Sequence, residues 1–125
     1  MSVVVIERTN TILYCDEWEA TVSFFRDTLA FATAFSNDWF IEFEVGDGSF
    51  LSVANARRAT VRSNAGDGIT LSWRVASLET TRRALLQADA RPTEIHARWG
   101  SLAFHVFDPE GHRIEFWSDV PSDRR

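Results

Sequence analysis

The 125-residue chain is 45% hydrophobic with 6 glycines and 3 prolines, a composition typical of one folded domain with its own core. Its 13 basic and 18 acidic residues give a formal charge of -5, which weakens attraction to phosphate backbones and argues against nucleic acid as a partner. The apolar run near the N-terminus is broken by Glu7 and Arg8, so we expect neither a signal peptide nor a membrane span, and a cytoplasmic protein.

The first half of the chain predicts a strand, a helix and further strands. Residues 11–15 are β-branched, aromatic or apolar throughout, which is typical of a strand covered on both faces. Asp16 is the expected N-cap of a helix whose apolar face is formed by Trp18, Val22, Phe25 and Leu29. Strands are expected over 38–45 and 49–53, joined by a tight Gly-Asp-Gly turn.

The second half repeats this plan. Residues 69–75 predict a strand, Ser77 is the expected cap of a helix that continues to about residue 90, and strands follow over 101–107 and 112–117. Positions 60 residues apart correspond, as in Leu13 with Trp73 and Trp39 with Trp99, and Ser52 corresponds to Glu115 at a spacing of 63. The polar stretch 55–68 is the natural connector.

The stretch between the last two strands reads DPEG, residues 108–111, and matches the preferences of a type I turn. With a turn of these four residues, Phe107 pairs with His112 and His105 pairs with Ile114. By strand alternation His105 then faces away from Glu115. We therefore expect His105 to pack beside the core, His112 to be solvated and His96 to lie on a loop.

Four segments together resemble the vicinal oxygen chelate superfamily over roughly residues 9 to 119. They read ILYCDEWEATVSFFRDTLAF, DWFIEFEVGDGSFLSV, LSWRVASLETTRRALLQADA and WGSLAFHVFDPEGHRIEF. That superfamily includes glyoxalase I, extradiol dioxygenases, fosfomycin-modifying thiol transferases and bleomycin-resistance binding proteins. The sequence pattern of this chain resembles the bleomycin-resistance branch most. The chain departs from the family at Ala30 and Ala90, where glycine usually follows each helix.

The resemblance implies an α+β fold in which two βαβββ modules form curved mixed sheets around a cavity, usually in a homodimer. It makes residues 1–125 one domain, with a first module over about 9–54, a connector over about 55–68 and a second module over about 69–119. The concave face of each sheet lines the cavity in this family. Alternation, together with the family's ligand positions, then assigns Tyr14, Ser52, Thr70, Arg74 and Glu115 to ligand binding. Trp39 and Trp99 are added as aromatic walls, since the resemblance to the bleomycin-resistance branch implies that the Trp-Gly pair before the penultimate strand lies at the mouth of the cavity.

Metal-dependent members of the family take four ligands from the first and last strands of their modules. The resemblance carries these positions to Asn10, Ser52, Thr70 and Glu115, of which Glu115 alone is a good ligand for nickel, zinc or iron. We therefore expect no metal and no cofactor.

Three functions are compatible with these residues. The first is a metal-independent protein that binds a small organic molecule, as in drug sequestration, and the net charge weakly favours a cationic ligand. The second is an isomerase, a lyase or a dioxygenase-like enzyme that uses Glu115 as general base or metal ligand. The third is a domain whose cavity no longer has a ligand. Fold resemblance alone does not separate them.

Overall fold

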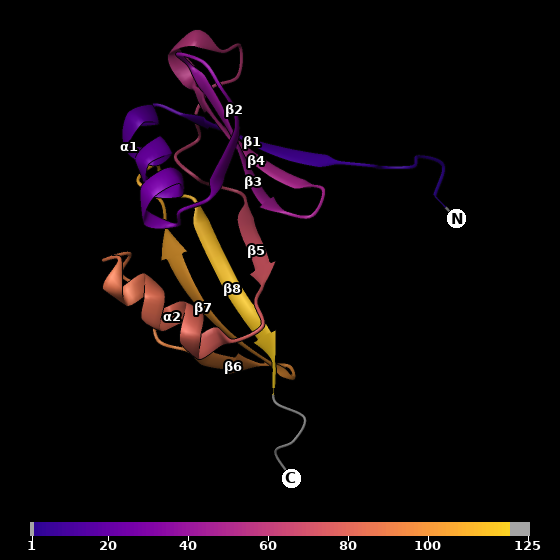
Figure 1. Ribbon diagram of the computed structural model, residues 1–125, viewed down its shortest axis with the longest axis vertical. Coiled ribbons are helices and arrows are strands. Elements are labelled where there is room, and N and C mark those ends of the chain that lie inside the picture. Colours follow the sequence, from indigo (N-terminus) through magenta and orange to yellow (C-terminus); the bar gives the residue numbers. More distant parts are fainter. Residues whose placement is uncertain (1, 121–125) are drawn as a thin grey trace. The chain divides into compact units, whose positions relative to one another are not determined.

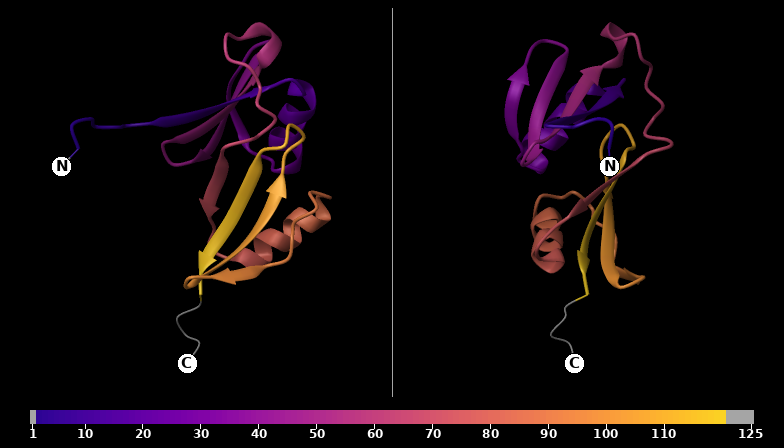
Figure 2. Two further views of the ribbon diagram at one scale, coloured as in Figure 1. Left: turned by 180° about the vertical axis from the view of Figure 1, so that it is seen from behind. Right: turned by 90° about the vertical axis from the view of Figure 1, so that its right-hand side faces the viewer.

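The computed structural model describes residues 2–120 and divides into two compact units, Met1–Asn64 and Ala65–Arg125 (Figure 1, Figure 2). Each unit contains one four-stranded mixed sheet and one main helix. The predicted α+β fold class is therefore confirmed. None of the described helices is long and apolar enough to cross a membrane.

The first unit has the strand order β1-β4-β3-β2, with β1 parallel to β4 and the remaining pairs antiparallel. Its elements are β1 (Thr9–Cys15), α1 (Trp18–Ser23), a π-helical turn (Phe24–Thr28), β2 (Ala32–Ser36), β3 (Phe40–Gly46) and β4 (Ser49–Asn55). A short 3-10 turn, Ala56–Arg58, follows.

The second unit repeats this order as β5-β8-β7-β6, again with one parallel pair, β5 with β8. Its elements are β5 (Thr70–Arg74), α2 (Leu78–Gln87), β6 (His96–Arg98), β7 (Ser101–Phe107) and β8 (Arg113–Asp119). The correspondence between the two halves that the sequence predicts is present in the strand pairing, because Ile12 pairs with Ser52 as Ser72 pairs with Glu115.

In each unit the helix lies against one face of the sheet (Figure 1). The core is on this face and is formed by apolar side chains at alternate strand positions and by inner residues of the helix; the strand residues include Leu13, Cys15, Phe43, Leu51 and Val53 in the first unit and Leu71, Phe104, Val106, Ile114 and Phe116 in the second. We call the opposite side the polar face of each sheet. Side chains alternate along 70–74: Leu71 is buried on the helix side, whereas Thr70, Ser72 and Arg74 lie on the polar face.

The helix ends agree with the sequence in one unit and differ in the other. The Ser77 side chain accepts a hydrogen bond from the Thr80 amide, so the predicted cap of α2 is confirmed. The prediction of Asp16 as cap of α1 is wrong, since Glu17 occupies that position without a side-chain cap bond. After the first helix Ala30 has the left-handed φ of 61° that glycine adopts easily, whereas in the second unit Asp89, not Ala90, has it.

Two strands were not predicted from the sequence: β2 and β6. Every residue of β2 is exposed and β6 has only three residues, so neither leaves an alternating apolar pattern. Each lies at one edge of its sheet, and β1 and β5 form the opposite edges. The loop position expected for His96 is therefore wrong, because His96 begins β6 and pairs with Ala103.

The turn between β7 and β8 has five residues, 108–112, and is organised by one buried carboxylate. Asp108 Oδ1 accepts the backbone N–H groups of Glu110, Gly111 and His112 at 2.8 to 3.0 Å, and Oδ2 lies 2.8 Å from His112 Nδ1. The Asp108 amide in turn donates to the His112 carbonyl. The expected solvation of His112 is therefore wrong, because its side chain is buried in this turn.

We predict that Asp108→Ala lowers the free energy of unfolding by about 2 to 4 kcal/mol, because three backbone donors and an imidazole lose a buried charged acceptor. Urea denaturation followed by tryptophan fluorescence measures the change. The control is Asp119→Asn, which removes an exposed carboxylate on the next strand and should cost less than about 1 kcal/mol. Equal losses in the two variants would contradict the role given to Asp108.

Candidate functional site

The polar face of the second sheet carries a row of three hydrogen-bonding side chains from three adjacent strands. Ser72 on β5 pairs with Glu115 on β8, and Glu115 pairs with His105 on β7. Ser72 Oγ donates to Glu115 Oε1 at 2.7 Å, and His105 Nε2 lies 3.5 Å from Glu115 Oε2. Glu115 is only 3% exposed, so this carboxylate is held in a nearly water-free position.

This arrangement corrects the prediction for His105. The sequence predicted a four-residue turn that pairs His105 with Ile114, whereas the five-residue turn pairs Phe107 with Arg113 and His105 with Glu115. A shift of one residue moves a side chain to the opposite face of a strand. His105 and Glu115 consequently face each other across the two strands.

His105 is fixed by its backbone and its ring, but its Nε2 atom has no hydrogen bond. Thr93 bonds to both its backbone groups at 2.8 and 2.9 Å, and its ring stacks on that of His96 with 5.4 Å between centroids. Among the described residues, Nε2 of His105 is the one buried side-chain nitrogen or oxygen atom that lacks a hydrogen-bond partner. Its distance of 3.5 Å to Glu115 Oε2 is too long for a normal hydrogen bond.

The charge state of His105 follows from its surroundings. Burial lowers the pKa of His105 below its ordinary value of 6.5, and the nearby guanidinium of Arg113 lowers it further. The carboxylate of Glu115 acts in the opposite direction and does not outweigh them. His105 is therefore neutral at pH 7, so one of its ring nitrogens can donate a hydrogen bond and the other can accept one.

The two arginines of this face have different partners. Arg74 forms an ion pair with Asp119 and lies over the Trp117 ring, 5.4 Å from its centroid, so it is engaged away from Glu115. Arg113 is the guanidinium beside the Glu115 row: its Nε donates to Thr70 Oγ1 at 3.0 Å. Thr70 and Arg74 were predicted from the sequence as site residues, whereas Arg113 was not.

The polar face of the first sheet carries a closed hydrogen-bond network. Ser52 is fully buried and its Oγ donates to Asn10 Oδ1 at 2.9 Å, while Asn10 Nδ2 donates to Glu42 at 3.2 Å. Glu42 also pairs with Arg8 at 2.9 Å. The two positions that correspond to family metal ligands in this unit, Asn10 and Ser52, therefore satisfy each other.

The donor atoms do not fit a bound transition metal. In the first unit the ligand positions are an amide and a hydroxyl that bond to each other, and in the second they are Thr70 and Glu115. Among residues 2–120 no group of three His, Cys, Asp or Glu side chains has a geometry that could hold an ion. One carboxylate with hydroxyl and amide neighbours is a weak ligand set for such metals.

The aromatic residues expected at the site lie near the ends of the sheets. Tyr14 shares a cross-strand row with Phe40, which Trp39 contacts edge-on with 5.5 Å between centroids. Trp99 is in the β6–β7 turn and is 100% exposed. Since His105 is four residues further along β7 than Ser101, Trp99 is roughly 13 Å or more from the Glu115 row.

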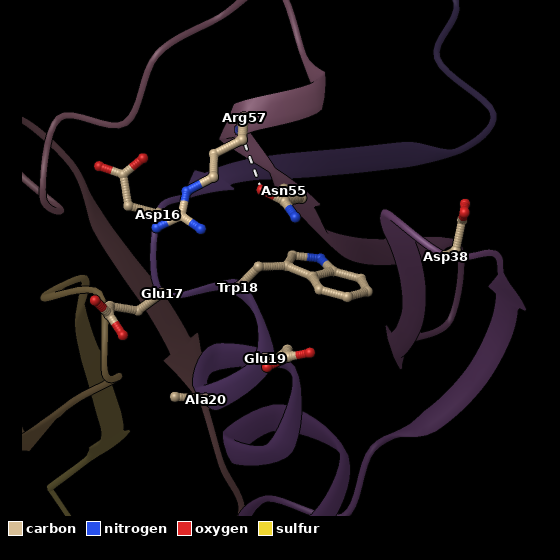
Figure 3. Close-up of a pocket in the computed structure, with 8 residues that line it drawn as sticks. All are labelled: Asp16, Glu17, Trp18, Glu19, Ala20, Asp38, Asn55 and Arg57. Carbon is tan, nitrogen blue, oxygen red and sulfur yellow. Dashed lines mark hydrogen bonds between the residues drawn. The ribbon is translucent and has the colours of Figure 1, made fainter.

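A hollow of about 450 Å³ in the first unit lies at the start of α1 (Figure 3). Trp18 is central in it, with Nε1 donating to the Val53 carbonyl at 2.9 Å, and around it are Asp16, Glu17, Glu19, Asp38 and Arg57. These carboxylates are exposed, and Asp38 already pairs with Arg58 at 3.0 Å. Solvated acidic groups of this kind do not define a ligand.

We predict that Glu115→Gln lowers the pKa of His105 further, because the carboxylate favours the imidazolium form. Histidine ring signals in an NMR pH titration measure this. The folded chain binds the His105 proton at lower pH than the unfolded chain does, so the contribution of neutral His105 to stability is complete above about pH 6.5 and is lost below it. Asp119→Asn, the control on the same strand, should leave this titration unchanged; a wild-type pKa at or above 6.5 would contradict the assignment.

Comparison with known proteins identifies the family of the chain. Residues 6–116 match the model of the Glyoxalase/Bleomycin resistance protein/Dioxygenase superfamily. A search of curated proteins finds no match.

Solved structures with the same fold are numerous. A glyoxalase/bleomycin resistance protein/dioxygenase from Nocardioides is 19% identical with a TM-score of 0.80, and the match covers 98% of this chain and 87% of that one. A lactoylglutathione lyase from Agrobacterium tumefaciens is 18% identical with a TM-score of 0.73, covering 94% and 95%. A glyoxalase-related enzyme from Fulvimarina pelagi is 19% identical with a TM-score of 0.72, covering 95% of each chain. The family match over most of the chain shows that the protein belongs to the glyoxalase/bleomycin resistance protein/dioxygenase superfamily.

Proposed function

We propose that the protein binds a small organic molecule on the polar face of its second sheet, without a metal ion. The observation that carries this proposal is the row of Ser72, Glu115 and His105. It holds a buried carboxylate beside an imidazole whose Nε2 has no hydrogen-bond partner among the described residues. Buried polar atoms in native proteins are nearly always hydrogen-bonded, so such an atom is best explained by a ligand group that completes it.

Independence from metal is supported by the donor atoms. Asn10 and Ser52 bond to each other, and Glu115 has a hydroxyl and a distant imidazole as neighbours. A divalent ion would have to break these hydrogen bonds to gain one carboxylate and otherwise weak ligands.

The ligand contacts inferred from the sequence remain part of the proposal. In the second unit they are Thr70, Arg74, Trp99 and Glu115, to which we add His105; in the first unit they are Tyr14, Trp39 and Ser52. Sequestration of a drug, as in bleomycin-resistance proteins, is one form of such binding. The fully exposed indole of Trp99 supports it, since an exposed aromatic face can stack on a planar ligand.

An acid–base enzyme is the second candidate, favoured by the approach of His105 Nε2 to Glu115 Oε2. A small movement would bring the carboxylate and the neutral imidazole within hydrogen-bond distance, where a proton taken up by Glu115 could pass to His105 and be returned, as general acid–base catalysis requires. One similar structure is that of a lactoylglutathione lyase, which keeps the lyase class among the alternatives.

We also propose that the protein is a cytoplasmic homodimer. The expectation of a dimer comes from the family, and it is supported by four successive apolar side chains, Val3, Val4, Val5 and Ile6, that are 63% to 98% exposed. The net charge supports a partner other than nucleic acid.

We predict that protein purified without affinity tag or chelator contains less than about one tenth of an equivalent of nickel, zinc, iron or manganese, because the donor set is poor. Elemental analysis by mass spectrometry measures the content, and melting curves with each added ion should show no stabilisation. A stoichiometric content of one ion per chain would overturn metal independence.

Ligand binding itself is tested with a panel of glycopeptides, quinones, small oxo-acids and aromatic amines, observed by tryptophan quenching and melting temperature. We expect at least one class to bind. Glu115→Gln should change its affinity by a modest factor if the protein is a binder, whereas an enzyme with Glu115 as base loses roughly a hundredfold or more in turnover with binding retained. Glu79→Gln, which changes an exposed carboxylate on α2 in the same way, is the matched control. If no compound quenches or stabilises, the proposed function fails.

A further inference from the structure

A second feature of the same polar face is a hollow at the end of the sheet where β5 and β8 begin. It has a volume of about 390 Å³ and is lined by the row Thr70, Arg113 and Phe107 and by residues of the preceding loop. Two glycines bring the chain close together there: a Cβ on Gly66 would lie 2.3 Å from the Gly111 backbone. Because Thr70, Arg113 and Phe107 are each two residues along their strands from Ser72, Glu115 and His105, the hollow lies next to that row.

Arg113 is the cation of this hollow and has free hydrogen-bonding capacity. Its Nε–H donates a hydrogen bond to Thr70 Oγ1 at 3.0 Å, and this bond fixes the plane of the guanidinium. In the described part of the chain its terminal nitrogens have no hydrogen bond and no ion pair, and the residue is exposed. Two parallel N–H groups on a fixed guanidinium match the two oxygens of a carboxylate.

The remaining lining supplies an apolar wall and one opposing charge. Phe107 and Ile69 are 54% and 44% exposed, so both offer apolar surface to a ligand. Asp67 also lines the hollow, but within residues 2–120 it forms no ion pair with Arg113. An internal pair therefore does not neutralise the guanidinium.

We propose that this hollow binds a small organic carboxylate, which pairs with Arg113 and lays its apolar part against Phe107 and Ile69. The proposal rests on the proposed function and names the chemical class of its ligand. The net charge of the chain favours a cationic ligand, whereas this hollow favours an anionic one. The local geometry decides, because it places a guanidinium without an ion pair at the hollow.

Binding at Arg113 is coupled to the neighbouring row. The groups that face the His105 ring are Glu115 and Arg113 from β8 and His96 from β6, and Arg113 lowers the pKa of His105. A bound carboxylate offsets the charge of Arg113, so the pKa of His105 rises on binding. By linkage, the affinity for the carboxylate then increases as the pH falls through the titration of His105.

The test uses benzoate as probe, with benzamide as its neutral isostere and benzylamine as a cation of similar size. NMR titration of the full chain should give saturable shifts of the Arg113 Nε–H and of the amides of Gly66, Gly68 and Gly111 with benzoate. Benzamide and benzylamine should bind at least tenfold more weakly. The His105 ring signals should titrate at higher pH when benzoate is bound.

Variants identify the group responsible. Arg113→Gln should weaken benzoate binding at least tenfold and remove the coupled shift of His105, and Arg113→Lys should keep part of the affinity because it keeps the charge. Asp67→Asn should strengthen benzoate binding, since a like charge is removed. Arg62→Gln, an exposed arginine outside the hollow, is the control for net charge and should have no effect.

The outcomes separate this inference from the proposed function. Equal binding of benzoate and benzamide, or equal effects of Arg113→Gln and Arg62→Gln, would overturn the carboxylate assignment. If aromatic amines or quinones bind instead, with shifts centred on Glu115 and His105, the proposed function stands and this inference fails. If none of the probes or panel compounds perturbs the polar face, both fail.

Discussion

The polar face of the second sheet depends on the hydrogen bonds that the buried carboxylate of Asp108 accepts. By accepting three consecutive backbone N–H groups it fixes a five-residue turn, and the turn length fixes which residues of β7 and β8 pair. With this pairing His105 and Arg113 share a face with Glu115. A turn one residue shorter would have put His105 on the face that the helix covers, away from Glu115.

The two units use the same backbone for different chemistry. Equivalent rows are Ile12, Ser52 and Glu42 in the first sheet and Ser72, Glu115 and His105 in the second. Each row contains one carboxylate, but on different strands. In the first unit Glu42 is neutralised by Arg8 and bonded to Asn10, whereas in the second the carboxylate faces a neutral imidazole. The first network is satisfied internally, and the second retains hydrogen-bonding capacity.

The sequence was sufficient for those parts of the fold that bury apolar surface. The strand 69–75 and the alternation of its faces follow from apolar periodicity, because the core imposes it. The Ser77 cap follows from the preference of serine for the N-terminus of a helix. The strand at 11–15 was also predicted, but the expectation that both its faces are covered is wrong, because Thr11 and Ile12 are exposed. The edge strands β2 and β6 are held by backbone pairing with one neighbour and bury little, so their residues carry no such pattern. Their existence depends on the rest of the sheet.

The site was harder to predict because it depends on register. Glu115 and Thr70 could be named from a family pattern, but His105 and Arg113 required the turn length. Local preferences of DPEG indicate a four-residue turn, and they do not include the additional hydrogen bond that the His112 amide donates to the Asp108 carboxylate. The available signal was an aspartate at the start of a turn that is followed by a histidine, since the carboxylate oxygens can accept more hydrogen bonds than one turn provides.

Electrostatics connect these observations to function. Arg113 acts on His105 through its charge without a bond between them, and Glu115 acts in the opposite sense at 3.5 Å. The side chains of Glu115 and His105 are mostly buried, so a change in the charge near them alters the protonation of the imidazole more strongly than it would in water. A ligand that neutralises Arg113 therefore also alters the hydrogen-bonding state of the Glu115 row. The proposed binding of a carboxylate at Arg113 and the proton affinity of His105 are therefore linked, because the same strand register places both residues on one face.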